Sequence, residues 1–173
     1  MTGNFTTAIT VDASRRAAFD AINDVSRWWG RITGSTTAVD DEFVYVVPGL
    51  HYSGFRVTAL EPGSRVAWLV TGSHLDFVAD KQEWNGSTVR FDIAEVDGRT
   101  QVVFTHEGLT ADEECYEVCT NAWGMFVNGS LKALIETGRG APYVFGGDEA
   151  LTADDHDELH RQVAASAASS AAG

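Results

Sequence analysis

One segment near the C-terminus, residues 110–143, carries the start and stop signals of a single long helix. Thr110 and Glu113 form a capping box, in which each side chain accepts a hydrogen bond from a backbone N–H that the first turn leaves unpaired. Gly138 suits the left-handed conformation that commonly follows a helix. We therefore expect a helix over about 111–137, roughly 40 Å long at about 1.5 Å per residue.

This predicted helix has more apolar side chains than one buried face can hold. A surface helix needs a single apolar stripe, whereas here the apolar residues spread around the axis. Such a helix needs a concave partner, which is the first indication of a cavity. The apolar residues are Tyr116, Val118, Cys119, Ala122, Trp123, Met125, Phe126, Val127, Leu131, Leu134 and Ile135.

The rest of the sequence predicts one strand, two short helices and then a run of strands. Residues 3–11 alternate and are rich in β-branched types, as in a strand. Asp12 or Ser14 then opens a helix that buries Ala18, Phe19 and Ile22. A second short helix covers 25–29 and stops at Gly30. Further strands are expected near 35–40, 43–48, 51–60, 65–72, 86–96 and 99–107.

Two hairpins fix which side chains share a face of the sheet. Asp97-Gly98 is a preferred type I′ turn, and taking it as the loop pairs Phe91 with Phe104 and Val89 with His106. Because side chains alternate, His106 becomes the only polar member of an apolar face. That face gathers Val89, Phe91, Ile93, Val102, Phe104 and His106, and the opposite face Arg90, Asp92 and Thr105; the Pro62-Gly63 turn likewise gathers Phe55, Val57, Ala59, Val66, Trp68 and Val70.

Composition limits the domain count and the partners. The chain has 173 residues, 44% of them hydrophobic, which is enough for one domain with a core. We expect that domain at 1–143, followed at 144–173 by an acidic and then Ala/Ser-rich tail that is a short helix or disordered. The net charge of −13 disfavours binding to nucleic acid or anionic lipid. With no export signal or membrane-length apolar run, we expect no membrane insertion and a cytoplasmic location.

Several local motifs resemble a known family. They are Ser26-Arg27-Trp28-Trp29-Gly30, the hairpin from Gly54 to Trp68, Thr105-His106-Glu107-Gly108-Leu109, and the helix with Tyr116, Cys119 and Trp123 that ends Thr137-Gly138-Arg139-Gly140-Ala141-Pro142. Over residues 4–143 the chain resembles the START-like (SRPBCC) superfamily. Within it the chain is most similar to the branch named after the C-terminal domain of the heat-shock chaperone ATPase activator.

The resemblance implies an α+β helix-grip fold. In that fold a curved antiparallel sheet of about seven strands wraps around the long C-terminal helix, and two short helices follow the first strand. The family fold encloses an apolar cavity for a lipid, sterol, polyketide or similar molecule. Because a fold does not settle function, the site residues have to carry that argument.

Aromatic side chains and a few polar ones are the candidate ligand contacts. Ligand sites are concave and mostly apolar with a few polar groups, but buried aromatic residues are more often plain core, so both interpretations stay open. The candidates are Trp29, Tyr45, Phe55, Trp68, Trp84, Phe91, Phe104, His106, Tyr116, Cys119, Trp123 and Phe126.

The polar candidates support no catalytic or metal assignment. His106 is either a pocket-wall group or a buried histidine bonded to a helix partner such as Tyr116. His51 and His74, at loop or strand-end positions, are weaker candidates. Cys115 and Cys119 share a helix face, but a structural zinc site has four ligands. A cysteine outside a disulfide usually behaves as a small buried hydrophobic residue. The sequence His156-Asp-Glu-Leu-His160 lacks the glutamate of the zinc-protease motif, and a solvated acidic helix is the simpler interpretation.

The leading hypothesis is a binding protein for a small hydrophobic molecule that is lipid-, polyketide- or aromatic-like, with no cofactor. The alternative is a polyketide cyclase or hydrolase-like enzyme in the same cavity, for which only His106, Tyr116 and Glu107 offer acid–base groups. A third hypothesis, a chaperone-associated interaction module, rests on the resemblance alone. A homodimer through a sheet edge or the tail is a further expectation that no residue pattern specifies.

Overall fold

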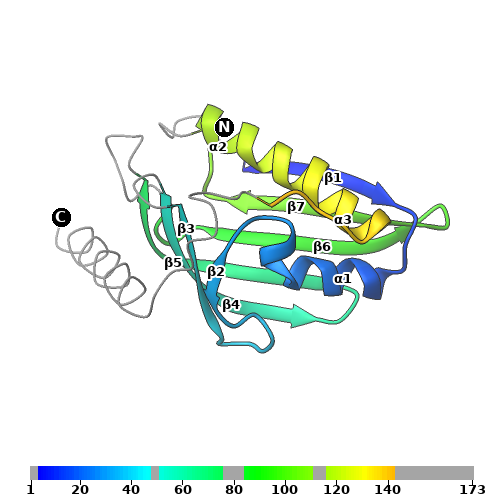
Figure 1. The fold of residues 1–173 in the computed structure, drawn as a ribbon, viewed down its shortest axis with the longest axis horizontal. Coiled ribbons are helices and arrows are strands. Elements are labelled where there is room, and N and C mark those ends of the chain that lie inside the picture. The colour runs from blue at the N-terminus through cyan, green and yellow to red at the C-terminus, as the bar shows by residue number, and fades with distance from the viewer. Residues whose placement is uncertain (1–3, 48–50, 76–83, 111–115, 143–173) are drawn as a thin grey trace.

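The computed structural model describes residues 4–47, 51–75, 84–110 and 116–142, and Figure 1 shows their arrangement. The capping box at Glu113, Cys115 and the tail lie outside the described residues. The elements are β1 (Phe5–Val11), α1 (Arg15–Asn23), the 3₁₀ helix η1 (Val25–Arg27), β2 (Ile32–Gly34), β3 (Glu42–Val47), β4 (His51–Glu61), β5 (Arg65–Leu75), β6 (Thr88–Val96), β7 (Arg99–Glu107), α2 (Tyr116–Trp123), the π-helix η2 (Gly124–Leu131) and α3 (Lys132–Thr137).

The strands form one antiparallel sheet of seven, in the order β1-β7-β6-β5-β4-β3-β2. Figure 1 shows α1 and the run α2-η2-α3 on the same side of this sheet. The C-terminal run, which we call the grip helix, and the sheet together confirm the predicted α+β helix-grip fold. Ser14 caps α1 by accepting a hydrogen bond from the Ala17 N–H, and this helix buries the three predicted residues.

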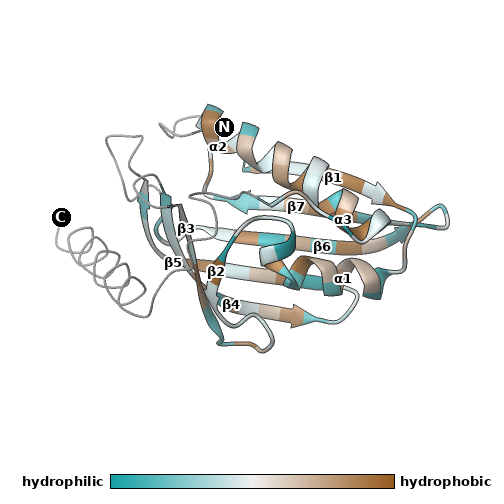
Figure 2. Cartoon of the chain, in the orientation of Figure 1, coloured by the Kyte–Doolittle hydropathy of each residue, from teal (hydrophilic) through white to brown (hydrophobic). Residues whose placement is uncertain are grey.

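The β6–β7 hairpin has the predicted register. Asp97 and Gly98 take positive φ angles of 53° and 77°, as a type I′ turn requires. Phe91 lies opposite Phe104 and Val89 opposite His106. Figure 2 shows hydrophobic and hydrophilic residues alternating along β6, so one face of the sheet is apolar and the other polar.

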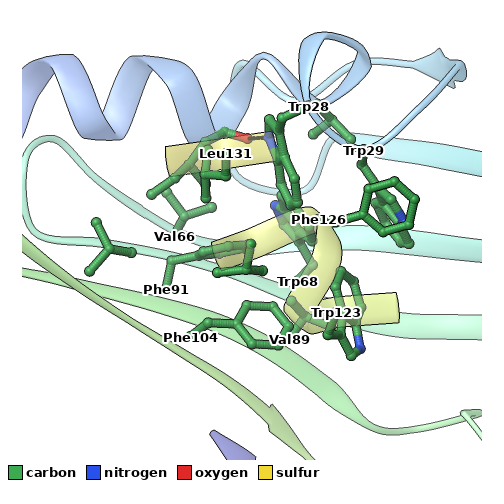
Figure 3. Close-up of a cluster of buried hydrophobic side chains, with 14 of the residues drawn as sticks. Trp28, Trp29, Val66, Trp68, Val89, Phe91, Phe104, Trp123, Phe126 and Leu131 are labelled. Atoms are coloured by element: carbon green, nitrogen blue, oxygen red, sulfur yellow. Dashed lines mark hydrogen bonds between the residues drawn. The ribbon is translucent and has the colours of Figure 1, made fainter. Parts of the chain in front are cut away.

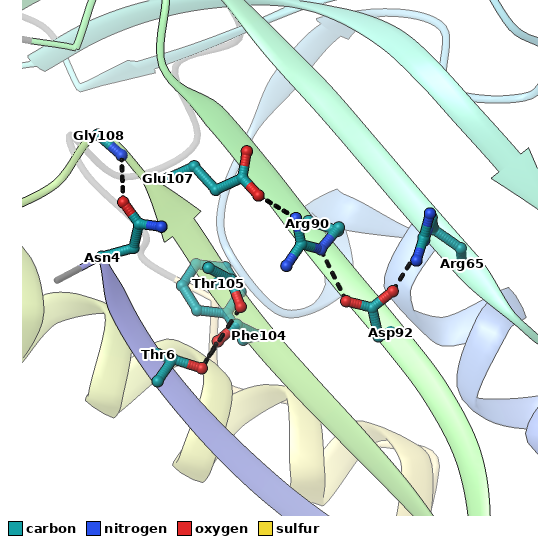
Figure 4. Close-up of polar contacts among 9 residues, drawn as sticks. All are labelled: Asn4, Thr6, Arg65, Arg90, Asp92, Phe104, Thr105, Glu107 and Gly108. Carbon is teal, nitrogen blue, oxygen red and sulfur yellow. Dashed lines mark hydrogen bonds and ion pairs between the residues drawn. The ribbon is translucent and has the colours of Figure 1, made fainter.

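The polar face carries Arg90 and Asp92, as predicted, and these side chains belong to a row of ion pairs across three strands. Asp92 on β6 accepts hydrogen bonds from Arg65 on β5 at 2.8 Å and from Arg90 at 2.7 Å. Arg90 also pairs with Glu107 on β7 (Figure 4). Because these side chains are partly exposed, each pair adds little stability. Their main effect is to keep this face of the sheet polar and hydrated.

One predicted strand is wrong. Residues 35–40 form bends and turns, and the strand lies earlier, at β2. The carboxylate of Asp41 accepts hydrogen bonds from the Ser35 hydroxyl at 2.6 Å and from the Thr37 and Ala38 N–H groups, both at 3.0 Å. Side chains that bond to nearby backbone in this way compete with strand pairing, and the β-branched composition of the segment hid that competition.

The Pro62-Gly63 hairpin confirms five of its six predicted core positions and corrects the sixth. A register shift between Val57 and Ala59 places Ala59 opposite Ala67, on the other face from Val66 and Trp68. Leu60 instead lies opposite Val66 and packs partly against the core. A β-bulge of this kind inserts one residue and reverses the alternation beyond it.

The grip helix ends as predicted and differs in its middle. Gly138 has a φ of 81° and closes the last turn with its N–H bonded to the Leu134 carbonyl. The centre of the helix is a π-helix rather than the expected α-helix, and a wider turn of this kind often marks a functional site. Val118 and Met125 are 56% and 60% exposed, so part of the apolar excess faces outward and does not line the sheet.

The chain after the grip helix folds back onto the turn that holds the paired tryptophans. The Ser130 hydroxyl donates to the Trp28 carbonyl and accepts from the Ala141 N–H, both at 2.7 Å. At Gly140 an added Cβ would lie 2.4 Å from the Arg27 carbonyl oxygen, so this close approach requires glycine. The Gly-Arg-Gly-Ala segment therefore fixes the position of Trp28 against the grip helix.

Candidate functional site

Aromatic side chains from the sheet, from the turn after α1 and from the grip helix converge in the interior (Figure 3). Trp28 and Trp29 come from the turn, Phe91 and Phe104 from β6 and β7, and Trp123 from the end of α2. Phe91 and Phe104 lie 5.1 Å apart at 65°, and Phe104 lies 4.7 Å from Trp123. These tilted and edge-to-face geometries are those that aromatic pairs prefer, so the rings form one continuous cluster.

Trp29 lies at the centre of this aromatic cluster. Its ring is stacked on Tyr45 at 4.0 Å and 10°, and it meets Trp123 of the grip helix at 4.8 Å. It is also parallel to Trp68 with the centroids 6.5 Å apart. With only 3% of its surface exposed, Trp29 joins the sheet, the turn and the helix.

The structure brings the predicted site residues together. Phe55, Trp68, Phe91 and Phe104 point inward from the sheet, and each of the other candidates is buried in the same core except Tyr116, which packs against it partly buried. The convergence is what a ligand site between sheet and helix would need, and equally what a filled core would show. Ligand contact by these residues therefore remains a prediction.

His106 is fully buried and bonded at both ring nitrogens. The Trp123 Nε1–H donates to His106 Nδ1 at 3.1 Å. The Ser87 hydroxyl lies 2.8 Å from His106 Nε2 and 2.6 Å from the Trp84 carbonyl oxygen. A carbonyl can only accept, so Ser87 donates to it and must accept from Nε2–H. The predicted bond to a partner on the long helix is confirmed, with Trp123 in place of the example Tyr116.

This bonding fixes the charge of His106. Burial, together with the nearby His51, lowers the pKa of His106 to about 3, so the ring is neutral at pH 7. Nδ1 accepts and Nε2 carries the hydrogen, which leaves neither nitrogen free for proton transfer to a bound molecule. His106 is thus a bonded wall group of the core in this arrangement, not a general base.

His51 belongs to the same end of the aromatic cluster, although its sequence position made it a weaker candidate site residue. Its ring contacts Tyr45 at 5.3 Å and Trp84 at 4.9 Å, and its Nε2 lies 2.8 Å from the Ser53 hydroxyl. Burial lowers the pKa of His51 to about 3. The alternation of side chains along β4 was the available signal. Phe55 lies four positions after His51 on the same strand, which places both side chains on the core face.

Trp84 lies between the two histidines. Its ring is edge-to-face with His51 at 4.9 Å and with His106 at 4.8 Å, and it is stacked on Trp123 at 5.7 Å and 12°. Trp84 was a predicted site residue, but the two imidazoles around it were not foreseen. We call this set, His51, Trp84, His106 and Trp123, the imidazole end of the aromatic cluster.

Two of the indole donors in the cluster are fully buried and have no acceptor among the described residues. Trp28 Nε1–H donates to the Ile22 carbonyl at 3.1 Å, and Trp123 Nε1–H to His106. The Nε1 atoms of Trp68 and Trp84 are buried without a hydrogen-bond partner in the part of the chain that the structure describes. A buried donor left unpaired costs roughly 1–3 kcal/mol, so each is a place where an acceptor would bind favourably.

The described residues offer no metal site: no three or more His, Cys, Asp or Glu side chains gather in positions that could hold an ion. Cys119 is buried and is not part of a disulfide. The proposed partner Cys115 and the His156–His160 segment lie outside the described residues. Within the described helices, none is long and apolar enough to cross a membrane.

Comparison with known proteins places the fold. The sequence profile of the family described as Activator of Hsp90 ATPase homolog 1-like protein matches residues 12–136. The solution structure of the Aha1 dimer from Colwellia psychrerythraea is 26% identical, with a TM-score of 0.65, covering 80% of this chain and 99% of its own. A search among curated proteins finds no significant relative.

Two further solved structures share the fold at lower identity. CalU16 from Micromonospora echinospora is 14% identical with a TM-score of 0.56, covering 96% of this chain and 88% of its own. DynU16, a protein in the dynemicin biosynthetic locus, is 14% identical with a TM-score of 0.61, covering 89% of this chain and 59% of its own. At this identity the likeness concerns the fold alone.

Proposed function

The chain belongs to the Activator of Hsp90 ATPase homolog 1-like protein family, and on that premise we propose that it binds a small hydrophobic molecule between the sheet and the grip helix. The observation that carries the proposal is the convergence of rings from both layers on Trp29, next to two buried indole donors without acceptors. An apolar lining with a few unpaired polar groups is the composition that ligand sites have.

The same geometry favours binding over catalysis. A cyclase or hydrolase needs an acid and a base that can reach the substrate, and both nitrogens of His106 already bond to Trp123 and Ser87. His51 is neutral at pH 7 because burial lowers its pKa to about 3, which makes it a weak base. The enzyme alternative would require both histidines to leave their present partners.

Partner assignments rest on the names of relatives. The solution structure of the protein from Colwellia psychrerythraea is that of a dimer, which supports a homodimer for this chain. The family description supports a chaperone partner as an alternative function. No particular surface of the described residues selects either partner.

Titration with 2-ethylnaphthalene, an aromatic hydrocarbon, tests the binding proposal. We expect saturable one-to-one binding by isothermal calorimetry, and a several-fold weaker affinity for Phe126→Leu, which alters a core residue of the grip helix. Met125→Ala is the matched control, because Met125 lies on the same helix and is 60% exposed; its affinity should equal that of the wild type. An absence of saturable heat at the solubility limit would refute the proposal.

A further inference from the structure

The indole N–H of Trp84 is an unused donor at the imidazole end of the aromatic cluster. Trp84 is 4% exposed, and its Nε1 has no hydrogen-bond partner within the described segments. A buried phenylalanine would have filled the same space without this cost. The unpaired donor therefore points to an acceptor that arrives from outside the chain.

The described hydroxyls near Trp84 are already paired. Ser53 bonds to His51 at 2.8 Å, and Ser73 donates to Asn85 at 2.8 Å. Ser87 bonds to His106 and to the Trp84 carbonyl. A ligand that enters at this end thus finds hydroxyls and a ring nitrogen in use, and the indole N–H of Trp84 open.

Among the described residues, no charged side chain is in ring contact with Trp84 to balance an ionised ligand. The rings that contact Trp84 are Trp123 and the two histidines, and burial keeps both imidazoles neutral at pH 7. The net charge of −13 further repels an anion on approach. Transfer of a carboxylate from water into such a place, with no cation to pair it, is strongly unfavourable.

We propose that the ligand is a neutral, flat, conjugated molecule with an uncharged oxygen acceptor, such as a ketone or quinone oxygen, and that this oxygen accepts a hydrogen bond from Trp84 Nε1–H. The inference rests on the binding function proposed above and narrows it. On this proposal, fatty acids and other carboxylates bind more weakly than neutral ketones. The flat shape follows from the stacked and edge-to-face surfaces that surround Trp84, which favour another ring over a flexible chain.

Three naphthalenes of nearly equal size test this inference: 2-acetylnaphthalene, 2-ethylnaphthalene and 2-naphthoate. The first offers a carbonyl acceptor, the second no acceptor, and the third a charged one. In the wild type at pH 7, 2-naphthoate should bind at least about tenfold more weakly than 2-acetylnaphthalene. Trp84→Phe should lower the affinity for 2-acetylnaphthalene about five- to tenfold, as expected for one lost hydrogen bond. It should change the affinity for 2-ethylnaphthalene less than about twofold.

Trp68→Phe is the matched control, because Trp68 is the other buried indole without an acceptor. Trp68→Phe should reduce the preference for the ketone over the hydrocarbon less than Trp84→Phe does, even where it lowers the affinity for both probes. Loss of that preference in Trp68→Phe instead of Trp84→Phe would overturn the assignment to Trp84. If Trp84→Phe lowered the affinity for 2-acetylnaphthalene and 2-ethylnaphthalene equally, or if 2-naphthoate bound tightly, the proposed ligand class would be wrong. The proposed binding function would not be affected.

A second measurement covers the case in which Trp84→Phe does not fold. In the wild type, 2-acetylnaphthalene should move the indole N–H proton of Trp84 further downfield than 2-ethylnaphthalene does, because only the ketone adds a hydrogen bond to that proton. Identical shifts with the two probes contradict the donor role. If neither probe binds the wild type at all, the proposed function itself fails, and the two failures are thereby distinguished.

Discussion

Trp29→Ala is expected to lower the free energy of unfolding by about 3–5 kcal/mol, the range for removing a large aromatic side chain from a packed core. Trp29 is 3% exposed and meets rings of the turn, the sheet and the grip helix, including Tyr45 at 4.0 Å and Trp123 at 4.8 Å. No single neighbour can collapse into the space, because the neighbours belong to different elements. The loss should therefore lie toward the upper end of the range.

Urea unfolding followed by circular dichroism measures this change. Met125→Ala is the control, since Met125 is 60% exposed and a surface substitution usually changes stability by less than about 0.5 kcal/mol. Trp29→Phe should lower the free energy of unfolding less than Trp29→Ala, because phenylalanine keeps part of the ring contact. A loss below about 1 kcal/mol for Trp29→Ala would show that the aromatic cluster is not the packed centre described here.

Acidification below pH 6.5 is expected to destabilise the fold steeply, because His51 and His106 are held neutral inside it. Burial lowers the pKa of each to about 3, whereas the unfolded chain protonates its histidines near pH 6.5. Between these values the unfolded state binds more protons than the native state, so stability falls as pH falls. Each histidine contributes a slope of up to about 1.4 kcal/mol per pH unit, or about 2.7 kcal/mol per unit together.

The free energy of unfolding measured at pH 7, 6, 5 and 4.5 tests this slope. His51→Gln removes one of the two titrating groups and should reduce the slope by about half. Asp41 and Asp92, whose pKa values are lowered, change the free energy of unfolding mainly below about pH 4, outside this window. A slope near zero, or a histidine NMR titration of His106 with a midpoint above pH 6, would contradict buried neutral histidines.

The sequence allowed the hairpin registers and the main helix to be predicted because local chemistry decides them. Asp97-Gly98 can supply the positive φ angles of a type I′ turn, and that turn then fixes every pairing along β6 and β7. The position of His106 on the apolar face followed from this register. Gly138 similarly fixed the end of the grip helix.

The features that were missed depend on tertiary contacts. The centre of the grip helix is a π-helix at 124–131, and no residue pattern in the helix predicts it. The strand predicted at 35–40 failed because Asp41 bonds to its backbone. A helix partner for His106 was predicted, with Tyr116 as the example; the residue is Trp123, because helix spacing alone does not give the rotation of a helix over a sheet.

The placement of His51 was the largest omission in the candidate site. Alternation along β4 put it on the core face, but its position at the first residue of the strand made it look like a loop residue. Its role emerged only with Trp84, which packs between His51 and His106 from a segment outside β4. Such a three-ring arrangement joins strands that are distant in sequence, beyond the reach of local patterns.

The most direct test of ligand binding in the aromatic cluster is a ¹H–¹⁵N NMR titration of the wild-type indole signals with 2-ethylnaphthalene. The chain has five tryptophans, all buried in the core, so each reports on the proposed site. We predict saturable shifts at Trp29, Trp84 and Trp123, and the smallest shift at Trp28, whose N–H is bonded to the Ile22 carbonyl. Five indole signals that stay in place up to the solubility limit of the probe would contradict a ligand site between the sheet and the grip helix.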